Sequence, residues 1–363
     1  MDGPKAPNEI EYSNLIQFLN TELRGQENWS ITNEYPLAFN EGNRRNIRII
    51  TEQNKVISHA LVRPLIVKTP VAPFKVAAIG SVVTSSDHRK NGYSTKVIES
   101  CLQLAMSQNC ELAILWTNLH DFYRRLGFEL AGSELSIIFD RQLQLPDSNL
   151  KFIEGAKVAP EAIHRLYQQH TVASHRTLDE LRQSLKIPNS RIYTAWDTHG
   201  LLQAYAIEGK GADLLGYVHE WGGGVPSLLQ LFNHIQLQQN KPITIITPKH
   251  AQNLIRQCKE HHLAIHEGFL GMVKILDVQK IINKVKRYAK SQGVTDLVLE
   301  YQDHKLFIGM RDNILTTDSE GDMARIFFGP LTPSEIQLFS ETTRTALAKI
   351  LPLPLWVWGW DSV

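Results

Sequence analysis

Cysteine is scarce in this sequence of 363 residues, which holds three: Cys101, Cys110 and Cys258. Their number is odd and they form no CxxC pair, which argues against a disulfide framework and against a thiolate cage for a metal. We therefore interpret them as packing residues in a reducing compartment. We expect no bound metal.

The sequence also lacks an excess of either charge, with 38 lysines and arginines against 37 aspartates and glutamates. A net charge of +1 provides no long-range field to attract phosphate backbones or anionic lipid, so neither nucleic acid nor a membrane is an expected partner. No apolar run approaches the length that crosses a bilayer, and the first residues have no signal-peptide pattern. We expect a cytoplasmic protein.

One hydrophobic core rarely organises more than about 250–300 residues, so a chain of this length should form two or three domains. The pattern breaks at a linker-like stretch after Phe139 and changes again near Gly271. We expect domains over 1–140, 150–270 and 271–363. Helices and strands are interspersed throughout, which predicts an α/β fold with mixed sheets.

The first domain should contain a strand meander, then a buried strand, a tight loop and a helix. The run from Lys75 to Ser85 is almost continuously apolar, as is typical of a central strand buried on both faces. The pattern predicts strands over 46–51, 56–67, 75–85, 111–117 and 133–139, and helices over 15–23, 93–108 and 119–126.

A similar order returns after the linker, which we interpret as a duplication whose second copy has diverged. It begins with helices over 160–170 and 178–185 and strands over 191–196, 201–208 and 213–220. A helix over 227–238, a strand over 243–247 and a helix over 251–261 follow. From Gly271 onward, a helix over 278–289 and strands over 296–301, 304–309 and 313–317 predict a small α+β domain. The apolar C-terminus, LPLPLWVWGWDSV, should be buried against another domain or subunit.

The hexapeptide Arg89-Lys90-Asn91-Gly92-Tyr93-Ser94 stands between the buried strand and the following helix. Gly92 permits close backbone approach, and the amides at a helix N-terminus favour an anion. Arg89 and Lys90 would add charge-assisted contacts, as expected for a pyrophosphate or a 3′-phosphate. For the hexapeptide alone, a surface turn with a helix cap is the alternative.

About thirty residues further on, the sequence FYRRLGF, residues 122–128, follows a second buried strand. An FYxxxGF sequence at this distance from an RxxGxS loop resembles the GNAT N-acetyltransferase superfamily, and the resemblance covers residues 46–133. It implies a GNAT fold, acetyl-CoA as cosubstrate and a primary amine of a small molecule or lysine-like acceptor. The combination is specific although each part is not.

The same resemblance assigns the cofactor contacts. The pantetheine arm would pair with backbone groups of Val82, Val83 and Thr84, for which core packing is the alternative role. Asn118 would contact the arm from the neighbouring strand. The pyrophosphate would lie on the loop, that is, on Arg89, Lys90, Asn91, Gly92, Tyr93 and Ser94.

Acetyl transfer needs a neutral amine, a stabilised oxyanion and a donor to the leaving thiolate, whose parent thiol has a pKa near about 8.5. Tyr123 matches the superfamily's donor tyrosine. Its phenol, with an ordinary pKa of about 10, is protonated at pH 7 and can donate a hydrogen bond to the departing sulfur. A packed tyrosine with its hydroxyl at the surface is the alternative.

Many GNAT enzymes carry a glutamate on the central strand, but residues 77–84 contain no acid. The layout resembles the enhanced intracellular survival (Eis) family, with a degenerate GNAT-like second domain, a sterol-carrier-like third domain and a habit of forming homo-oligomers. In that family the terminal carboxylate enters the first domain's site. The resemblance implies Val363 as base, with an ordered water or a frayed terminus as alternatives; a free α-carboxylate, with a pKa near about 3.5, would need desolvation.

The sequence therefore favours an acetyl-CoA-dependent N-acetyltransferase that works by direct attack in a ternary complex. The alternative from another class is a non-catalytic protein that binds acyl-CoA or lipid as a sensor.

Overall fold

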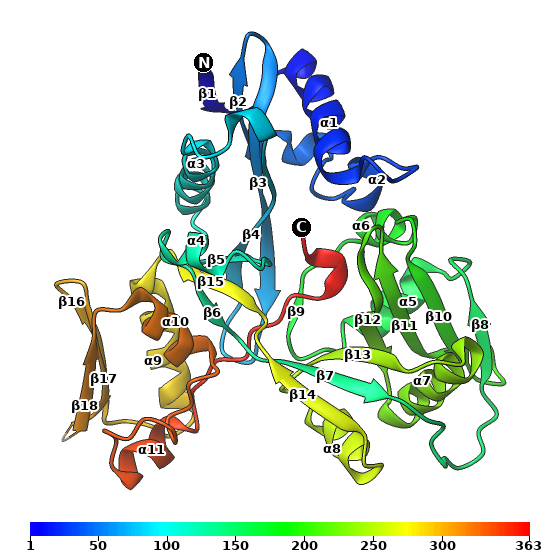
Figure 1. Cartoon of the computed structure of the whole chain (residues 1–363). Helices are drawn as coiled ribbons and strands as arrows, with labels where there is room; N and C mark the ends of the chain where they lie inside the picture. The colour runs from blue at the N-terminus through cyan, green and yellow to red at the C-terminus, as the bar shows by residue number, and fades with distance from the viewer. Residues whose placement is uncertain (312) are drawn as a thin grey trace.

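A computed structural model describes residues 1–311 and 313–363, which form two large mixed sheets and one small antiparallel sheet (Figure 1). The first sheet, with its helices, is called the first unit. Its strand order is β1 (Asp2–Lys5), β2 (Ile47–Glu52), β3 (Lys55–Lys68), β4 (Phe74–Thr84), β5 (Leu112–Leu115), β15 (Gly271–Ile275) and β6 (Glu129–Ala131), and the two-residue β9 (Ala173–Ser174) adds to β3.

In the first unit, the helices expected over 93–108 and 119–126 are present, the helix expected over 15–23 begins six residues earlier, and a short helix that was not predicted also precedes the meander. α1 (Glu9–Arg24) and α2 (Ile31–Glu34) precede the meander, α3 (Tyr93–Ser107) connects β4 to β5, and α4 (His120–Arg124) follows β5. β4 and β5 are parallel, as a helical crossover requires, whereas β2, β3 and β4 pair antiparallel. Apolar side chains cover both faces of β4, and Val76, Ala77 and Ala78 are fully buried.

The second unit repeats this arrangement. Its strand order is β14 (Ala264–Gly268), β7 (Glu134–Phe139), β13 (Ile243–Pro248), β12 (Asp213–Gly223), β11 (Leu202–Lys210), β10 (Arg191–Trp196) and β8 (Lys151–Glu154). β12 and β13 are parallel and joined by α7 (Val225–Gln239), as β4 and β5 are joined by α3. The remaining helices are α5 (Pro160–Tyr167), α6 (Leu178–Ser184) and α8 (Gln252–Glu260). The fold is thus a duplicated mixed α/β arrangement.

Two stretches of the chain cross from one large sheet to the other, and each of them contains two consecutive strands. β6 and β15 pair in the first sheet, and their continuations β7 and β14 pair in the second. Two residues join the strands in each stretch. Gly132, with a positive φ of 72°, lies between β6 and β7, and Leu270 lies between β14 and β15. The expected boundaries at residues 140 and 271 therefore do not coincide with the edges of the sheets, because β7 and β15 each belong to the neighbouring sheet. The division into three domains stays a prediction.

The rest of the chain forms a small third unit. It contains α9 (Val278–Ser291), the antiparallel sheet of β16 (Leu297–Gln302), β17 (Lys305–Met310) and β18 (Asn313–Thr317), and then α10 (Glu320–Phe328) and α11 (Glu341–Leu347). α10 packs against β6 and β15, which attaches the third unit to the first sheet. None of the described helices is long and apolar enough to span a bilayer.

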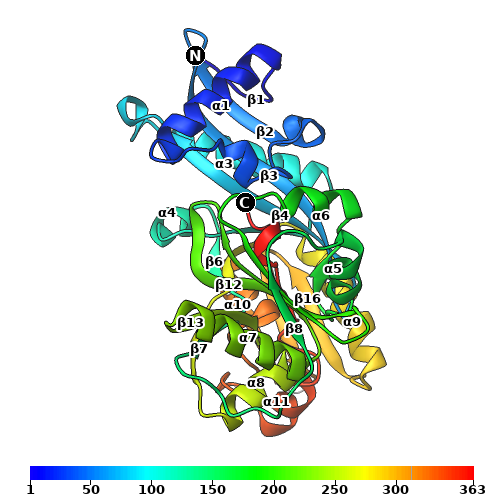
Figure 2. The same cartoon turned by 90° about the vertical axis from the view of Figure 1, so that its right-hand side faces the viewer.

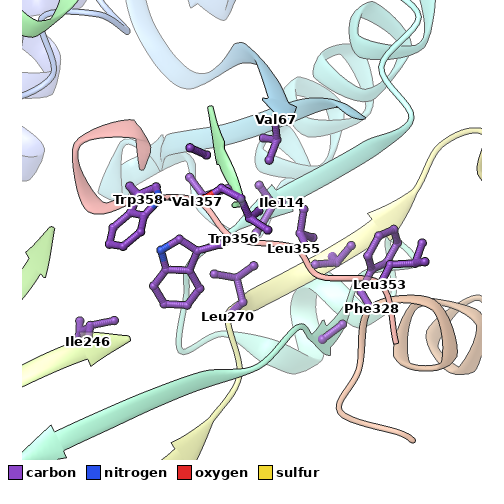
Figure 3. Packing of buried hydrophobic residues seen from close by; sticks show 14 of the residues in the cluster. Val67, Ile114, Ile246, Leu270, Phe328, Leu353, Leu355, Trp356, Val357 and Trp358 are labelled. Carbon is purple, nitrogen blue, oxygen red and sulfur yellow. Dashed lines mark hydrogen bonds between the residues drawn. The ribbon is translucent and has the colours of Figure 1, made fainter. Parts of the chain in front are cut away.

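The C-terminal segment, residues 350–363, runs from the third unit into the space between the other two (Figures 1 and 2). Figure 3 shows its side chains among apolar residues of all three units, including Ile114 of β5, Ile246 of β13 and Phe328 of α10. Trp356 is 1% exposed and Trp358 fully buried. The expected burial of the apolar C-terminus is therefore confirmed.

Candidate active site

The site begins where β4 and β5 separate. Their parallel pairing ends at Ala78 opposite Ile114, while β4 continues to Thr84. The register against β3 shifts in this stretch, and Ser81 has a positive φ of 51°. A buried histidine holds this bulge, since His59 Nδ1 donates to the Ser81 carbonyl at 2.7 Å. β4 beyond Ala78 therefore has an edge that β5 does not cover, and this edge includes Val82, Val83 and Thr84.

The expected phosphate loop follows this edge directly. Gly92 caps α3 with a positive φ of 76°, and a Cβ built on it would meet no atom within 4 Å. The space in front of the helix is open, and no side chain caps its first turn. The first amides of an α-helix lack intrahelical acceptors, so Tyr93, Ser94 and the next residue present N–H groups there.

Two contacts fix the loop to β4. Thr84 Oγ1 and Ser94 Oγ lie 2.7 Å apart, and Arg89 Nε donates to the Thr84 carbonyl at 3.2 Å. Arg89 also approaches Glu22 of α1 at 3.8 Å, with its side chain largely exposed, and Lys90 is exposed beside it. Two cations therefore stand beside a helix N-terminus, which is the charge pattern that a phosphate prefers.

Tyr123 lies on α4 in the apolar cluster beneath β4, α3 and β5. Its ring packs edge-on against Phe122 and Phe128, and Ile79 and Leu115 belong to the same cluster. Burial raises the pKa of Tyr123 to about 12. The phenol is therefore protonated throughout the neutral range. Asn118 is exposed in the bend between β5 and α4.

Val363 reaches β4 from the opposite direction. A Cβ built on Gly80 would overlap the backbone carbonyl carbon and oxygen of Val363 and would lie 2.8 Å from its Cγ2. The last residue of the sequence is thus in contact with the central strand two residues beyond the point where β4 and β5 separate. Gly80 leaves the space that this contact needs.

A cavity of about 840 Å³ opens at this end of the segment. Val363 and Ser362 line it, together with side chains from both units that sequence reasoning did not identify, among them Trp116, His120, Glu134 and Tyr217. Their sequence signal is limited to position, since Trp116 lies near the end of one predicted strand and Glu134 near the start of another.

Glu134 is the most distinctive group in this cavity. Burial raises the pKa of its carboxyl group to about 7, and no cation of the described residues forms an ion pair with it. The other acidic side chain of the lining, Asp213, already contacts Arg24 and the Tyr35 hydroxyl. Glu134 can therefore receive a positively charged group from solution.

Comparison with known proteins agrees with this geometry. The family model of the GNAT acetyltransferase domain matches residues 13–131. A search of curated proteins found no match. The structure resembles a GCN5-related N-acetyltransferase from Anabaena variabilis, with a TM-score of 0.70 and 17% identity over 99% of both chains.

Two further solved structures share the fold over almost their whole length. They are Eis1 from Mycobacterium abscessus, with a TM-score of 0.66 and 13% identity over 100% of both chains, and a GCN5-related N-acetyltransferase from Kribbella flavida, with a TM-score of 0.65 and 12% identity over 99% of this chain and 97% of the other. At such identities the likeness shows the fold alone. The match of residues 13–131 to the GNAT family model supports acyl transfer as the class of reaction.

Proposed function

We propose that this protein transfers an acetyl group from acetyl-CoA to a primary amine of a small molecule or lysine-like acceptor. The observation that carries the proposal is the meeting of three features near one strand: the uncovered edge of β4, the open phosphate-type loop at its end, and a cavity lined by Val363, the residue that contacts Gly80. Acyl-CoA would occupy the first two, and the amine the third.

The cosubstrate would bind as an extended chain. The pantetheine amides would hydrogen-bond backbone groups of Val82, Val83 and Thr84 on the edge of β4 that β5 does not cover. The diphosphate would rest on the loop that comprises Arg89, Lys90, Asn91, Gly92, Tyr93 and Ser94. Asn118 would contact the arm from the other side of the opening.

In the reaction the amine nitrogen bonds to the acetyl carbon and the carbon–sulfur bond breaks. Tyr123 would donate a hydrogen bond to the departing sulfur. With its pKa at about 12, the phenol is a weaker acid than a thiol, whose pKa is about 8.5. Stabilisation of the thiolate by hydrogen bonding therefore suits Tyr123 better than complete proton transfer.

The base would be the carboxylate of Val363 or a water that it orients. A bound ammonium must lose a proton before it can attack, and the carboxyl group of Val363 lies against β4 at the wall of the cavity. This role requires that the purified chain end at Val363, which intact-mass measurement establishes.

CoA release, measured with a panel of polyamines, aminoglycosides and lysine peptides, tests the proposal. Turnover that falls strongly on Tyr123→Phe, with acetyl-CoA still bound, supports the enzyme. Tight binding of acyl-CoA without turnover on any amine supports the sensor instead. The likeness of the third unit to sterol carrier proteins and the formation of a homo-oligomer remain predictions.

A further inference from the structure

The second unit has the fold of the first but lacks a counterpart of the loop that precedes α3. It contacts the last residues of the sequence instead. Residues 358–363 lie against β11 and β12 of the second unit and against β9, which adds to the first sheet. Trp358 Nε1 donates to the Val172 carbonyl at 3.1 Å, and the Trp360 amide donates to Glu220 at 3.3 Å. The short helix Gly359–Asp361 ends this segment just before Val363.

Asp361 is held in a buried group of four charges. Arg176 donates to its two carboxylate oxygens at 3.1 Å from Nε and 2.7 Å from Nη2, and Arg63 of β3 approaches it at 3.3 Å. Arg176 also bonds Glu220 at 2.9 Å. Burial disfavours the ionised form of Asp361, but Arg176 and Arg63 outweigh it and lower its pKa to about 2. Two cations and two anions thus balance one another.

Lys210 of β11 binds the residues at and just after the short helix Gly359–Asp361. Its ammonium contacts three acceptors of the terminal segment: the Gly359 carbonyl at 3.0 Å, the Ser362 carbonyl at 2.6 Å and the Ser362 hydroxyl at 3.1 Å. Burial lowers the pKa of Lys210 to about 7, and the protonated amine has three N–H donors, one for each of these acceptors. The side chain is 1% exposed, and it also lies 4.6 Å from the centre of the Tyr35 ring.

The segment packs closely against its neighbours at two glycines. A Cβ on Gly359 would overlap the buried ring of His219, and a Cβ on Gly80 would overlap Val363. Apolar burial of residues 353–358 alone would hold the segment in place, whereas buried ion pairs add little stability over apolar contacts. The directional polar contacts instead define the position and register of the terminal segment.

We propose that the second unit positions the catalytic terminus, with Lys210 and Arg176 acting as positioning residues that hold the Val363 carboxyl group against Gly80. This inference rests on the proposed function. On this inference, the second unit contributes to the reaction in the first unit although it binds no cofactor itself.

The test is a double-mutant cycle between Lys210→Met and deletion of Val363, measured as CoA release at saturating acetyl-CoA. Because a displacement of about 1 Å can reduce a rate on the order of a hundredfold, Lys210→Met should lower kcat by about that factor. The KM for acetyl-CoA should stay at the wild-type value, since β4 and the phosphate loop are untouched. Lys259→Met, an exposed lysine on α8, is the matched control and should have wild-type kinetics.

In the chain without Val363, Lys210→Met should cause no further loss of kcat, because its effect acts through that residue. Full wild-type kcat in Lys210→Met, or losses that multiply in the double variant, overturns the inference. Unchanged kcat on deletion of Val363 alone overturns the terminal base of the proposed function instead.

Ser362→Ala tests the inference even if Lys210→Met fails to fold, because this variant keeps Lys210. Ser362→Ala removes one acceptor of Lys210 and the bond from the Ser362 hydroxyl to the Gly359 carbonyl, at 2.7 Å. The inference expects a reduced kcat with an unchanged KM for acetyl-CoA, and a wild-type kcat contradicts it.

Discussion

Gly80 is the residue at which the terminal segment and the central strand meet. Its backbone φ is not positive, so alanine is sterically excluded there by Val363 rather than by the backbone conformation. We predict that Gly80→Ala displaces Val363 and lowers kcat at least about tenfold, by the sensitivity of rates to misplacement.

Steady-state kinetics measures this effect. The control is Gly224→Ala, at the residue that precedes α7 in the second unit, where a Cβ would meet no atom within 4 Å. Equal kinetics in the two variants would contradict the placement of Val363 against β4.

Glu134 should make the stability of the fold depend on pH. Burial raises the pKa of its carboxyl group from an ordinary 4.5 to about 7, so the folded state binds this proton more tightly than the unfolded state. Its contribution to stability is therefore complete below about pH 4.5 and lost as the pH rises through about 7. We predict that Glu134→Gln stabilises the protein by about 1–2 kcal/mol at pH 8 and much less at pH 5.

Urea unfolding of both proteins at the two pH values measures this difference. An equal change at pH 5 and pH 8 would mean that Glu134 is ionised in the folded protein and has a solvated or paired carboxylate.

At the scale of elements, the parts nearest the site were the most predictable. Strands β2 to β4, helix α3 and the turn at Gly92 follow from apolar runs, 3.6-residue periodicity and turn residues, and each lies within two residues of its predicted bounds. Local pattern suffices there because each element is long or is bounded by turn-forming residues. The Gly92 turn and FYxxxGF were therefore located without the structure.

The elements that sequence reasoning missed are short, or depend on distant partners. β14 and β15 have five residues each and pair with β7, β5 and β6, more than one hundred residues away along the chain. No local pattern specifies such pairing. The cavity residues were missed for the same reason, since Trp116 and Glu134 meet only when both sheets are formed.

The crossing strands yield a prediction about Gly132. It combines a positive φ of 72° with close packing, because a Cβ would lie 2.6 Å from Leu270 Cβ. Gly293 has nearly the same φ, 74°, but open space around it. We predict that Gly132→Ala destabilises the fold by about 1–2 kcal/mol more than Gly293→Ala, because only the first adds overlap to backbone strain.

Equilibrium denaturation of the two variants compares them directly. Equal losses of unfolding free energy would mean that Leu270 moves aside without cost and that the crossing is loosely packed.

At the scale of the whole molecule, the three units depend on one another. The C-terminal segment joins the apolar clusters of all three, and the crossing strands make each large sheet contain a strand from beyond its expected boundary. Composition and length predicted several domains but could not reveal this exchange, which depends on which strand edges are free after folding. Duplication, in contrast, was visible as a repeated order of elements.

The central claim is that the loop before α3 holds the phosphates of CoA and so directs a thioester towards Tyr123. Isothermal titration calorimetry of CoA with the double variant Arg89→Ala, Gly92→Asp tests it most directly. The matched control is Arg287→Ala, Gly293→Asp, which makes the same changes at an exposed arginine and a glycine of similar φ in the third unit. Loss of one charge-assisted hydrogen bond and gain of a repelling carboxylate should raise the Kd at least about tenfold, while the control binds CoA as the wild type does. Wild-type affinity in the loop variant, or no detectable binding of CoA by the wild type, would contradict the account.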